Sequence, residues 1–345
     1  MLLRAVAAEW LYCSMKKGMV FFCLIGLGLG LHAQSTAGIT GKQDSSYSTY
    51  SAYNSTRKTH PGIRIVPEYS SPLVAEKRDV EYCKSPDRSL RADVFYPAEQ
   101  TGKVLYPAVL IVHGGGWRSG NRAQHHPLAQ RLAALGYVCV TPGYRLSTEA
   151  LYPAAVHDLK AALRWMRGHA REYGIDTSRI AVLGFSAGGE LATFLGSTNN
   201  LSRFEGTGCY PDLSSRVQAI VDLDGILSFV HPESGEGNDS LSTSAATYWF
   251  GYPKKTAPAL WQDASALSHA GPQTPPVLFI NSSVARMHAG RDDFRQVLDR
   301  YKIYSEVHTL AGAPHSFPLF DPWFEPMLQY IHDFLVRVFG RKEKT

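Results

Sequence analysis

The hydrophobic positions along the chain fall into two alternating patterns. Short segments that are mostly apolar predict buried strands, and longer segments with apolar residues three or four apart predict helices that cover a sheet. The expected strands span residues 78–82, 91–95, 108–112, 137–140, 180–183, 219–223, 276–280 and 305–309. The expected helices span residues 127–135, 153–173, 190–195, 292–301 and 326–339. This alternation predicts an α/β fold with a mostly parallel sheet, right-handed crossovers and helices on both faces.

Three segments depart from the alternation. Residues 85–88 form a turn between the first two strands, which predicts an antiparallel hairpin. Residues 225–267, after the sixth strand, are irregular, aromatic and polar, and we expect them to cap the functional site. Residues 34–61 are rich in Ser, Thr, Tyr, Asn and Gly, which predicts a disordered linker. The folded domain is therefore expected to span residues 62–340.

The first 33 residues have the pattern of a secretory signal peptide. Lys16 and Lys17 precede an apolar stretch at 19–31, and a small-residue cleavage site ends at Ala33. Met15 is the more natural start. A stretch of about 13 apolar residues is too short to cross a bilayer, which needs about 20. We therefore expect a cleaved signal over residues 1–33, a periplasmic or secreted protein, and no stable membrane insertion; the alternative is an uncleaved anchor.

Composition narrows the class of protein further. The 345 residues are 44% hydrophobic and 19% charged, which is typical of a globular protein with a sizeable core. The formal charge of +5 is modest and gives no reason to expect a nucleic-acid partner. After signal removal three cysteines remain. Cys139 lies in an apolar strand, and whether Cys83 and Cys209 pair is left open. No grouping of ligand residues predicts a metal site, and the sequence does not fix the oligomeric state.

Residues 180–189 carry the first chemical motif. An apolar strand runs directly into Gly-Phe-Ser-Ala-Gly, and a helix-forming segment follows. In that context G-x-S-x-G predicts a sharp turn that exposes the hydroxyl of Ser186 at a helix N-terminus. The alternative is a structural Gly/Ser turn. We expect Ser186 to be a nucleophile.

A glycine run and a late histidine supply complementary chemistry. Gly115 and Gly116 follow a buried strand, where backbone N–H groups can turn toward one point without a Cβ in the way. Together with the N–H of Ala187 they are expected to form an oxyanion hole. The alternatives are a flexible loop or a phosphate cradle, and the latter lacks its lysine. His315 lies on the loop after the last strand, from which it can serve Ser186 as base and then acid.

These motifs, in this order, resemble the α/β-hydrolase superfamily over residues 78–339. The similarity is greatest to secreted carbohydrate esterases of the hormone-sensitive-lipase-like and feruloyl-esterase-like types. It implies a serine carboxylic-ester hydrolase that forms an acyl-enzyme and needs no cofactor. The matching segments read His-Gly-Gly-Gly-Trp at 113–117, Tyr-Arg-Leu at 144–146, Asp-Leu-Lys-Ala-Ala-Leu-Arg-Trp at 158–165, Gly-Ile-Asp at 174–176, Gly-Phe-Ser-Ala-Gly-Gly at 184–189, and His315.

The resemblance leaves the acid of the triad open. The superfamily places an aspartate in the loop after the strand ending at Ile280, but residues 281–288 contain no carboxylate. Asp224, at the end of the sixth strand, is one candidate, because a buried carboxylate needs partners. Asp292 is the other, although its place in the first turn of a helix also suits the helix dipole. A third alternative is that the protein has no true acid.

The same loop suggests a substrate. Arg286, His288 and Arg291 would place cationic or switchable donors beside the serine, and arginine suits the binding of a carboxylate. Trp117 is expected to stack on sugar rings, as are Trp249, Trp261 and Trp323. We therefore expect a polysaccharide or oligosaccharide ester substrate, with acetyl or methyl groups on pectin or xylan. The alternatives are a general small-ester hydrolase or lipase, and a catalytically degenerate module that binds glycans.

Overall fold

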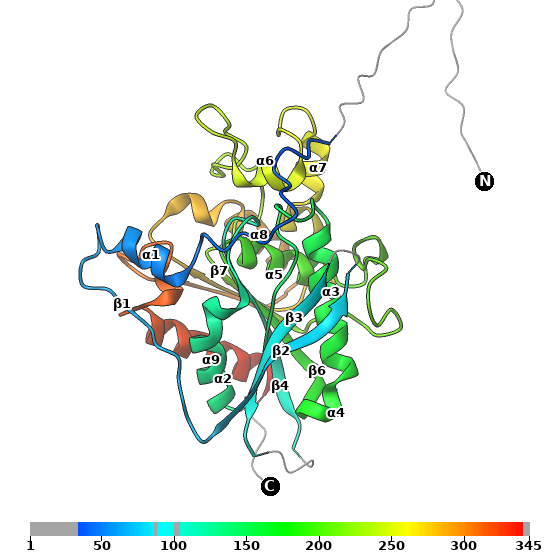
Figure 1. Ribbon diagram of the computed structural model, residues 1–345, viewed down its shortest axis with the longest axis vertical. Helices are drawn as coiled ribbons and strands as arrows, with labels where there is room; N and C mark the ends of the chain where they lie inside the picture. Colours follow the sequence, from blue (N-terminus) through cyan, green and yellow to red (C-terminus); the bar gives the residue numbers. More distant parts are fainter. Residues whose placement is uncertain (1–33, 86–87, 100–103, 341–345) are drawn as a thin grey trace, which may run out of the picture. The chain divides into compact units, whose positions relative to one another are not determined.

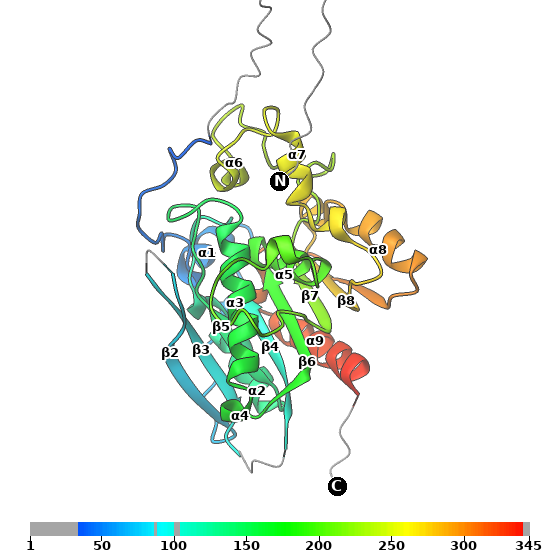
Figure 2. The same cartoon turned by 90° about the vertical axis from the view of Figure 1, so that its right-hand side faces the viewer.

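The central element of the fold is an eight-stranded sheet. A computed structural model describes residues 34–85, 88–99 and 104–340; the expected signal peptide lies outside them. The strand order is β2-β3-β5-β4-β6-β7-β8-β9, antiparallel at β2/β3 and β3/β5 and parallel elsewhere (Figures 1 and 2). The expected hairpin and mostly parallel sheet are thus confirmed. The strands are β2 (Val74–Lys84), β3 (Ser89–Pro97), β4 (Tyr106–Val112), β5 (Val138–Pro142), β6 (Ile175–Phe185), β7 (Ala219–Leu223), β8 (Val277–Asn281) and β9 (Ser305–Thr309).

Helices cover both faces of this sheet. In β4, Leu110 and Val112 belong to one buried cluster and Val109 and Ile111 to the other, because successive side chains of a strand point to opposite faces. The first cluster includes residues of α3 (Ala154–Gly168), α5 (Ala187–Ser197) and α8 (Arg291–Arg300). The second includes residues of α2 (His126–Ala134) and α9 (Phe324–Phe339). The expected helix at 153–173 is divided at His169 into α3 and α4 (Ala170–Tyr173).

Residues 34–65, termed here the N-terminal segment, correct the prediction of a disordered linker. Helix α1 (Thr49–Thr56) begins with a capping box between Ser48 and Ser51. Strand β1 (Arg64–Ile65) pairs with β10 (Phe320–Asp321) near the end of the chain. Ala52 is buried in a small cluster with residues from that distant part. Few aliphatic residues are enough here, because the partners are supplied by the C-terminal part of the chain.

Residues 225–276, between β7 and β8, form the expected cap, which we name the cap insert. It is less irregular than expected, since it contains α6 (Ala245–Phe250), α7 (Pro258–Asp263) and the 3₁₀ helix η3 (Ala266–His269). Its aromatic residues extend the hydrophobic cluster that includes α3 and α5, and Trp249 and Trp261 are fully buried there. A Cβ built on Gly116 would lie 3.1 Å from the Cβ of Ala245, so α6 begins directly against the glycine run.

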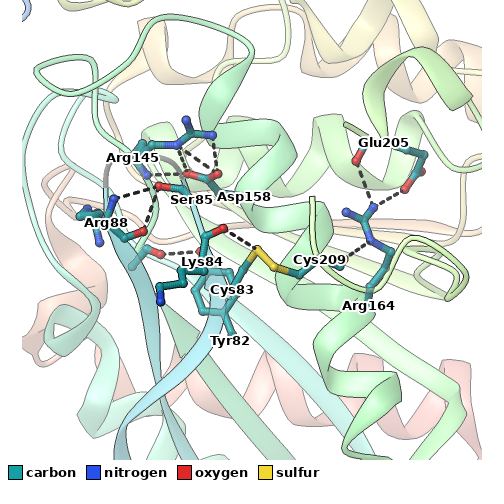
Figure 3. Close-up of a disulfide and its surroundings, with 11 residues drawn as sticks. Tyr82, Cys83, Lys84, Ser85, Arg88, Arg145, Asp158, Arg164, Glu205 and Cys209 are labelled. Atoms are coloured by element: carbon teal, nitrogen blue, oxygen red, sulfur yellow. Dashed lines mark hydrogen bonds and ion pairs between the residues drawn. A yellow bond between two sulfur atoms is a disulfide. The ribbon is translucent and has the colours of Figure 1, made fainter. Parts of the chain in front are cut away.

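A disulfide joins Cys83 at the end of β2 to Cys209 in the loop before β7, 126 residues later (Figure 3). The Cα atoms are 5.6 Å apart, within the range that a disulfide spans. Arg164 of α3 holds the same loop by donating to the carbonyl oxygen of Cys209 and to the carboxylate of Glu205. Cys139 is free and buried. Among residues 34–340 as described, no helix is long and apolar enough to cross a membrane.

Candidate active site

Ser186 occupies a strained turn between β6 and α5. Its φ of 57° and ψ of −123° are values that non-glycine residues rarely adopt. The turn is tight enough that a Cβ on Gly184 would lie 1.9 Å from the carbonyl oxygen of Gly188. The flanking glycines are therefore required by the close approach of the backbone. The result is a serine at the first turn of α5, as the G-x-S-x-G motif predicts.

Ser186, His315 and Asp224 are joined by hydrogen bonds between three loops. His315 Nε2 lies 2.8 Å from Ser186 Oγ, and His315 Nδ1 lies 2.9 Å from Asp224 Oδ2. The imidazole also packs against Phe185, with ring centroids 4.9 Å apart. The structure therefore brings together three of the residues predicted from sequence. They come from the loops after β6, β7 and β9, which all end at the same edge of the parallel sheet.

Asp224 is the carboxylate of this arrangement. It is completely buried, and Oδ1 accepts a hydrogen bond of 2.8 Å from the backbone N–H of Ser282. The side-chain amide of Asn281 lies 3.4 Å from the same oxygen. The loop after β8, which contains no carboxylate, thus supplies donors to an acid on the neighbouring loop. Those donors lower the cost of burying the charge of Asp224.

Asp292, the alternative acid, is not part of the site. Its side chain is 70% exposed and accepts a hydrogen bond of 2.9 Å from Arg291 Nε. That hydrogen bond to the guanidinium holds the pKa of the Asp292 carboxyl below its usual value. The correction has a simple geometric cause: helix α8 begins at Arg291, so Asp292 lies in its first turn and faces solvent.

The glycine loop presents unused donors toward the serine. Gly115 and Gly116 have φ values of 126° and 61°, which open the loop without side-chain obstruction. The carbonyl of Gly115 is turned away, since it accepts from the N–H groups of Arg118 and Ser119. Within the described part of the chain, the N–H groups of Gly115, Gly116 and Ala187 donate to no protein acceptor. They therefore stay available for an anionic oxygen, as an oxyanion hole requires.

Trp117 supports this loop and does not face a substrate, which corrects the prediction. It is buried, its ring stacks on Trp249 at 5.2 Å, and Nε1 donates to Glu190 Oε2 at 3.0 Å. Glu190 is in α5, one turn after Ser186, so this bond ties the glycine loop to the helix that carries the nucleophile. Burial raises the pKa of the Glu190 carboxyl well above its usual value, which favours the neutral acid.

The other tryptophans expected to stack on sugars are also explained by packing. Trp249 and Trp261 are fully buried in the hydrophobic cluster that the cap insert shares with α3 and α5. Trp323 is half-buried and packs edge-on against His60 of the N-terminal segment, with ring centroids 5.8 Å apart. The prediction that tryptophans stack on sugars is therefore wrong for Trp117, Trp249 and Trp261. An insert of this size needs large apolar side chains to pack against the rest of the domain.

Arg286, His288 and Arg291, which were predicted to bind substrate, have different roles in the structure. His288 Nε2 lies 3.0 Å from the carbonyl oxygen of Ser282, and Arg291 Nη1 donates to Asn281 Oδ1 at 2.8 Å. Both brace the loop that supports Asp224, so their predicted role in substrate binding is corrected. Arg286 differs, because its side chain is 55% exposed and lies 4.0 Å from Glu236. It stays a candidate for contact with substrate.

Two contacts connect the N-terminal segment to this site, and sequence analysis missed them. The N–H of Gly120, at the end of the glycine loop, donates to the carbonyl oxygen of Asp44. Thr56 Oγ1 lies 2.8 Å from the hydroxyl of Ser316, the residue after His315. Asp44 and Thr56 lie far from the motifs in the sequence, so no local pattern could have predicted these contacts. Within the described residues, no group of three His, Cys, Asp or Glu side chains is arranged to hold a metal.

Known proteins were compared with this chain in sequence and in structure. The sequence model of the BD-FAE family matches residues 92–286, more than half of the 345 residues. The chain belongs to the BD-FAE family. The matched region holds Ser186, Asp224 and the glycine run, whereas His315 lies beyond its end. Family membership confirms the resemblance to α/β-hydrolase esterases that the motifs indicated.

Relatives of this BD-FAE member are esterases by name. "Probable carboxylic ester hydrolase LipM" of Mycobacterium tuberculosis strain H37Rv is 32% identical over 271 residues, covering 76% of this chain and 61% of that protein. "Esterase LipC" of the same strain is 30% identical over 230 residues, covering 62% and 54%. The chain thus spans a little over half of the length of these curated relatives.

Solved structures share the fold. The structure described as "Truncated form of carbohydrate esterase from gut microbiota" has a TM-score of 0.65 at 23% identity, covering 78% of this chain and all of that one. Apo "Thermogutta terrifontis esterase 2" has a TM-score of 0.64 at 23% identity, covering 80% and 98%. These similarities confirm the α/β-hydrolase fold that sequence analysis expected. At this level of identity they show the fold alone.

Proposed function

We propose that this BD-FAE member is an exported serine esterase that removes acetyl or methyl ester groups from a plant-type polysaccharide such as pectin or xylan. The observation that carries the proposal is the hydrogen-bonded series Ser186–His315–Asp224 beside three unused backbone donors. A nucleophile, a base oriented by a buried acid, and an oxyanion hole are the groups that acyl transfer requires. The esterase names of the relatives support the reaction class.

The reaction follows from the geometry. Ser186 Oγ attacks the ester carbonyl carbon while its proton passes to His315 Nε2, 2.8 Å away. Asp224 accepts from Nδ1 and stabilises the imidazolium that forms. The carbonyl oxygen becomes an oxyanion, to which the N–H groups of Gly115, Gly116 and Ala187 donate. The C–O bond to the alcohol breaks as His315 returns the proton to it. Water then attacks the acyl-enzyme by the same steps and releases the acid.

A second candidate, a hydrolase of small esters, is favoured by one observation. Trp117, Trp249 and Trp261 are buried, so no tryptophan platform for sugars is formed by them. A small-ester hydrolase needs no such platform. "Ethyl acetate hydrolase" of Pseudomonas putida, 27% identical over 72% of this chain and 80% of its own length, carries such a name. The absence of a carboxylate from the loop after β8 motivates the third alternative, a degenerate glycan-binding module. The hydrogen bond between Asp224 and His315 argues against it.

Release of acid and alcohol from defined esters tests the proposal. The purified enzyme is expected to release acetate from acetylated xylan or methanol from methyl-esterified pectin, in addition to hydrolysing p-nitrophenyl acetate. Ser186→Ala is expected to lower each rate by about 10⁶-fold, because no other group can form the acyl-enzyme. Turnover of p-nitrophenyl acetate without release from either polysaccharide would favour the small-ester hydrolase. Activity unchanged in Ser186→Ala would contradict both.

Export is the second part of the proposal. The pattern of residues 15–33 supports it, as does the Cys83–Cys209 disulfide, because such bonds persist in oxidising compartments like the periplasm. When the full chain is expressed in a Gram-negative host, the protein is expected in the periplasmic fraction with an N-terminus at Gln34. Protein found only in the cytoplasmic fraction, with residues 15–33 retained, would contradict export.

A further inference from the structure

A polar cavity that the proposed chemistry does not use lies beside the glycine loop. Its volume is about 360 Å³, and its lining includes side chains from β2, from β3, from the N-terminal segment and from the residues that follow Gly120. We call it the arginine pocket. The lining residues that matter below are Gln43, Arg78, Arg88, Asp93, Asn121 and Arg122.

The walls of the arginine pocket are rich in guanidinium groups, each of which is paired with a carboxylate. Three guanidinium groups line it, and Asp93 is the carboxylate among the lining residues. Asp93 is buried and already engaged, since Arg122 Nε lies 2.8 Å from Oδ2 and the N–H of Asp79 donates to Oδ1. His126 also lines the pocket, with Nε2 2.8 Å from Asp93 Oδ2. Carboxylates outside the lining also pair with the arginines: Glu68 and Glu76 with Arg78, Glu149 with Arg88, and Asp79 with Arg122. An incoming anion therefore meets N–H donors of paired guanidinium groups, and these donors are what the pocket offers it.

The arginines are held in place yet keep donors for a ligand. Arg88, drawn in Figure 3, donates from Nε to Glu149 at 2.6 Å, and Arg122 Nη2 donates to Asp79 at 2.7 Å. A guanidinium has five N–H donors, and Arg122 Nη1 has no partner within the described residues. The side chains of Arg88 and Arg122 are each 28% exposed and that of Arg78 is 41% exposed. A ligand can therefore reach Arg122 Nη1 without displacing an ion pair. In Arg78, by contrast, Nε and both Nη atoms already donate to Glu68 and Glu76.

The arginine pocket lies beside the edge of the sheet that carries the catalytic residues, but Ser186 does not line it. Asn121 follows Gly120, whose N–H is bound by the carbonyl of Asp44, next to Gln43. Strand β3, which carries Asp93, is separated from β6, which carries Ser186, by β5 and β4. Three spacings of about 4.8 Å give about 14 Å across the sheet. A molecule seated in the arginine pocket is thus too far away to be the reacting ester, and a chain-like substrate is needed to occupy both places.

Resting on the proposed function, we propose that the arginine pocket is a subsite for a uronic acid unit of the polysaccharide, some units away from the ester that is cleaved. A carboxylate fits the planar donor fork of arginine, which can bind both of its oxygens. The side-chain amides of Gln43 and Asn121 add groups able to pair with sugar hydroxyls. A neutral chain such as unsubstituted xylan would leave the guanidinium donors unpaired and gain less from the same cavity.

Binding to the inactive Ser186→Ala enzyme tests the subsite separately from the reaction. By calorimetry, a trimer of galacturonic acid is expected to bind at least about tenfold more tightly than xylotriose, and to weaken as salt is raised. Gln43→Glu adds a negative charge at the pocket in an exposed position and is expected to weaken binding of the acidic trimer about tenfold. Arg122→Lys keeps the charge beside Asp93 but removes the fork, and a severalfold loss is expected.

Controls separate the arginine pocket from Arg286, the exposed cation that stays a candidate for substrate contact. Gln43→Ala is expected to cost less than Gln43→Glu, and Thr59→Glu, on the same segment but outside the pocket, is expected to leave binding unchanged. Equal binding of the two trimers, or a loss with Arg286→Gln but none with Gln43→Glu, would overturn the subsite. Failure to release acetate or methanol would overturn the proposed function instead, so the two failures are distinguishable.

Discussion

Asp224→Asn is expected to lower kcat by about 10,000-fold, the largest effect we predict for any residue that does not touch the ester. Asp224 accepts from His315 Nδ1 and so fixes the tautomer in which Nε2 can take a proton from Ser186. Asparagine has a similar shape but can donate to Nδ1, which leaves the proton on Nε2. Steady-state hydrolysis of p-nitrophenyl acetate measures the loss, which is expected in kcat with little change in KM.

Asp292→Asn is the matched control, because it makes the same chemical change in the other aspartate considered for this role. Its side chain is exposed and bound to Arg291, so kcat is expected to stay within about twofold of the unmodified enzyme. The reverse result, a large loss with Asp292→Asn and near-normal activity with Asp224→Asn, would show that the catalytic acid is wrongly assigned. Large losses in both variants would point to residues 281–291, which contact both aspartates.

Replacing Cys83 and Cys209 by serine is expected to lower the free energy of unfolding by about 5 kcal/mol. The disulfide closes a loop of 126 residues, and a loop of that length restricts the unfolded chain strongly. Most proteins have only about 5 to 15 kcal/mol of stability, so this loss would be a large share of the total. Urea unfolding, followed by far-ultraviolet circular dichroism, measures it through the transition midpoint.

A reducing agent provides the control for the disulfide. Dithiothreitol is expected to move the midpoint of the natural protein toward that of the Cys83→Ser, Cys209→Ser variant, and to leave the variant itself unchanged. The buried thiol of Cys139 is present in both proteins and cancels from the comparison. A natural protein that unfolds at the same urea concentration with and without reductant would show that the bond contributes little.

Sequence analysis could predict the sheet and two residues of the site because their signals are local. The strand-to-helix context of Ser186 and the position of His315 after the last strand depend on neighbouring residues only. The identity of the catalytic acid depends on contacts between segments that are distant in the sequence. Asp224 lies at a positive φ of 53° just after β7, and its partners come from the loop after β8. No pattern within one segment contains that information, so the choice between Asp224 and Asp292 stayed open.

The errors share a physical cause. Sequence alone does not distinguish a tryptophan that stacks on sugars from one that packs in a core. The stacking of Trp117 on Trp249, 132 residues later, decides between these two roles. Residues 34–61 look disordered when only their own hydrophobicity is counted. Their order comes from contacts with Ser316, Leu319 and Phe320, more than 250 residues later. Local sequence sets the propensity of a segment, whereas tertiary contacts decide whether it is ordered.

The pairing of β1 with β10 has a consequence for the order of folding. Ile65 and Phe320 are separated by 255 residues, so the contact that joins them closes about three quarters of the chain into one loop. During synthesis β1 emerges long before β10, so the N-terminal segment at first lacks the surface on which it packs. We therefore expect the bracing of the histidine loop to form late, after the central sheet, so that hydrolytic activity appears only after β10 has paired with β1.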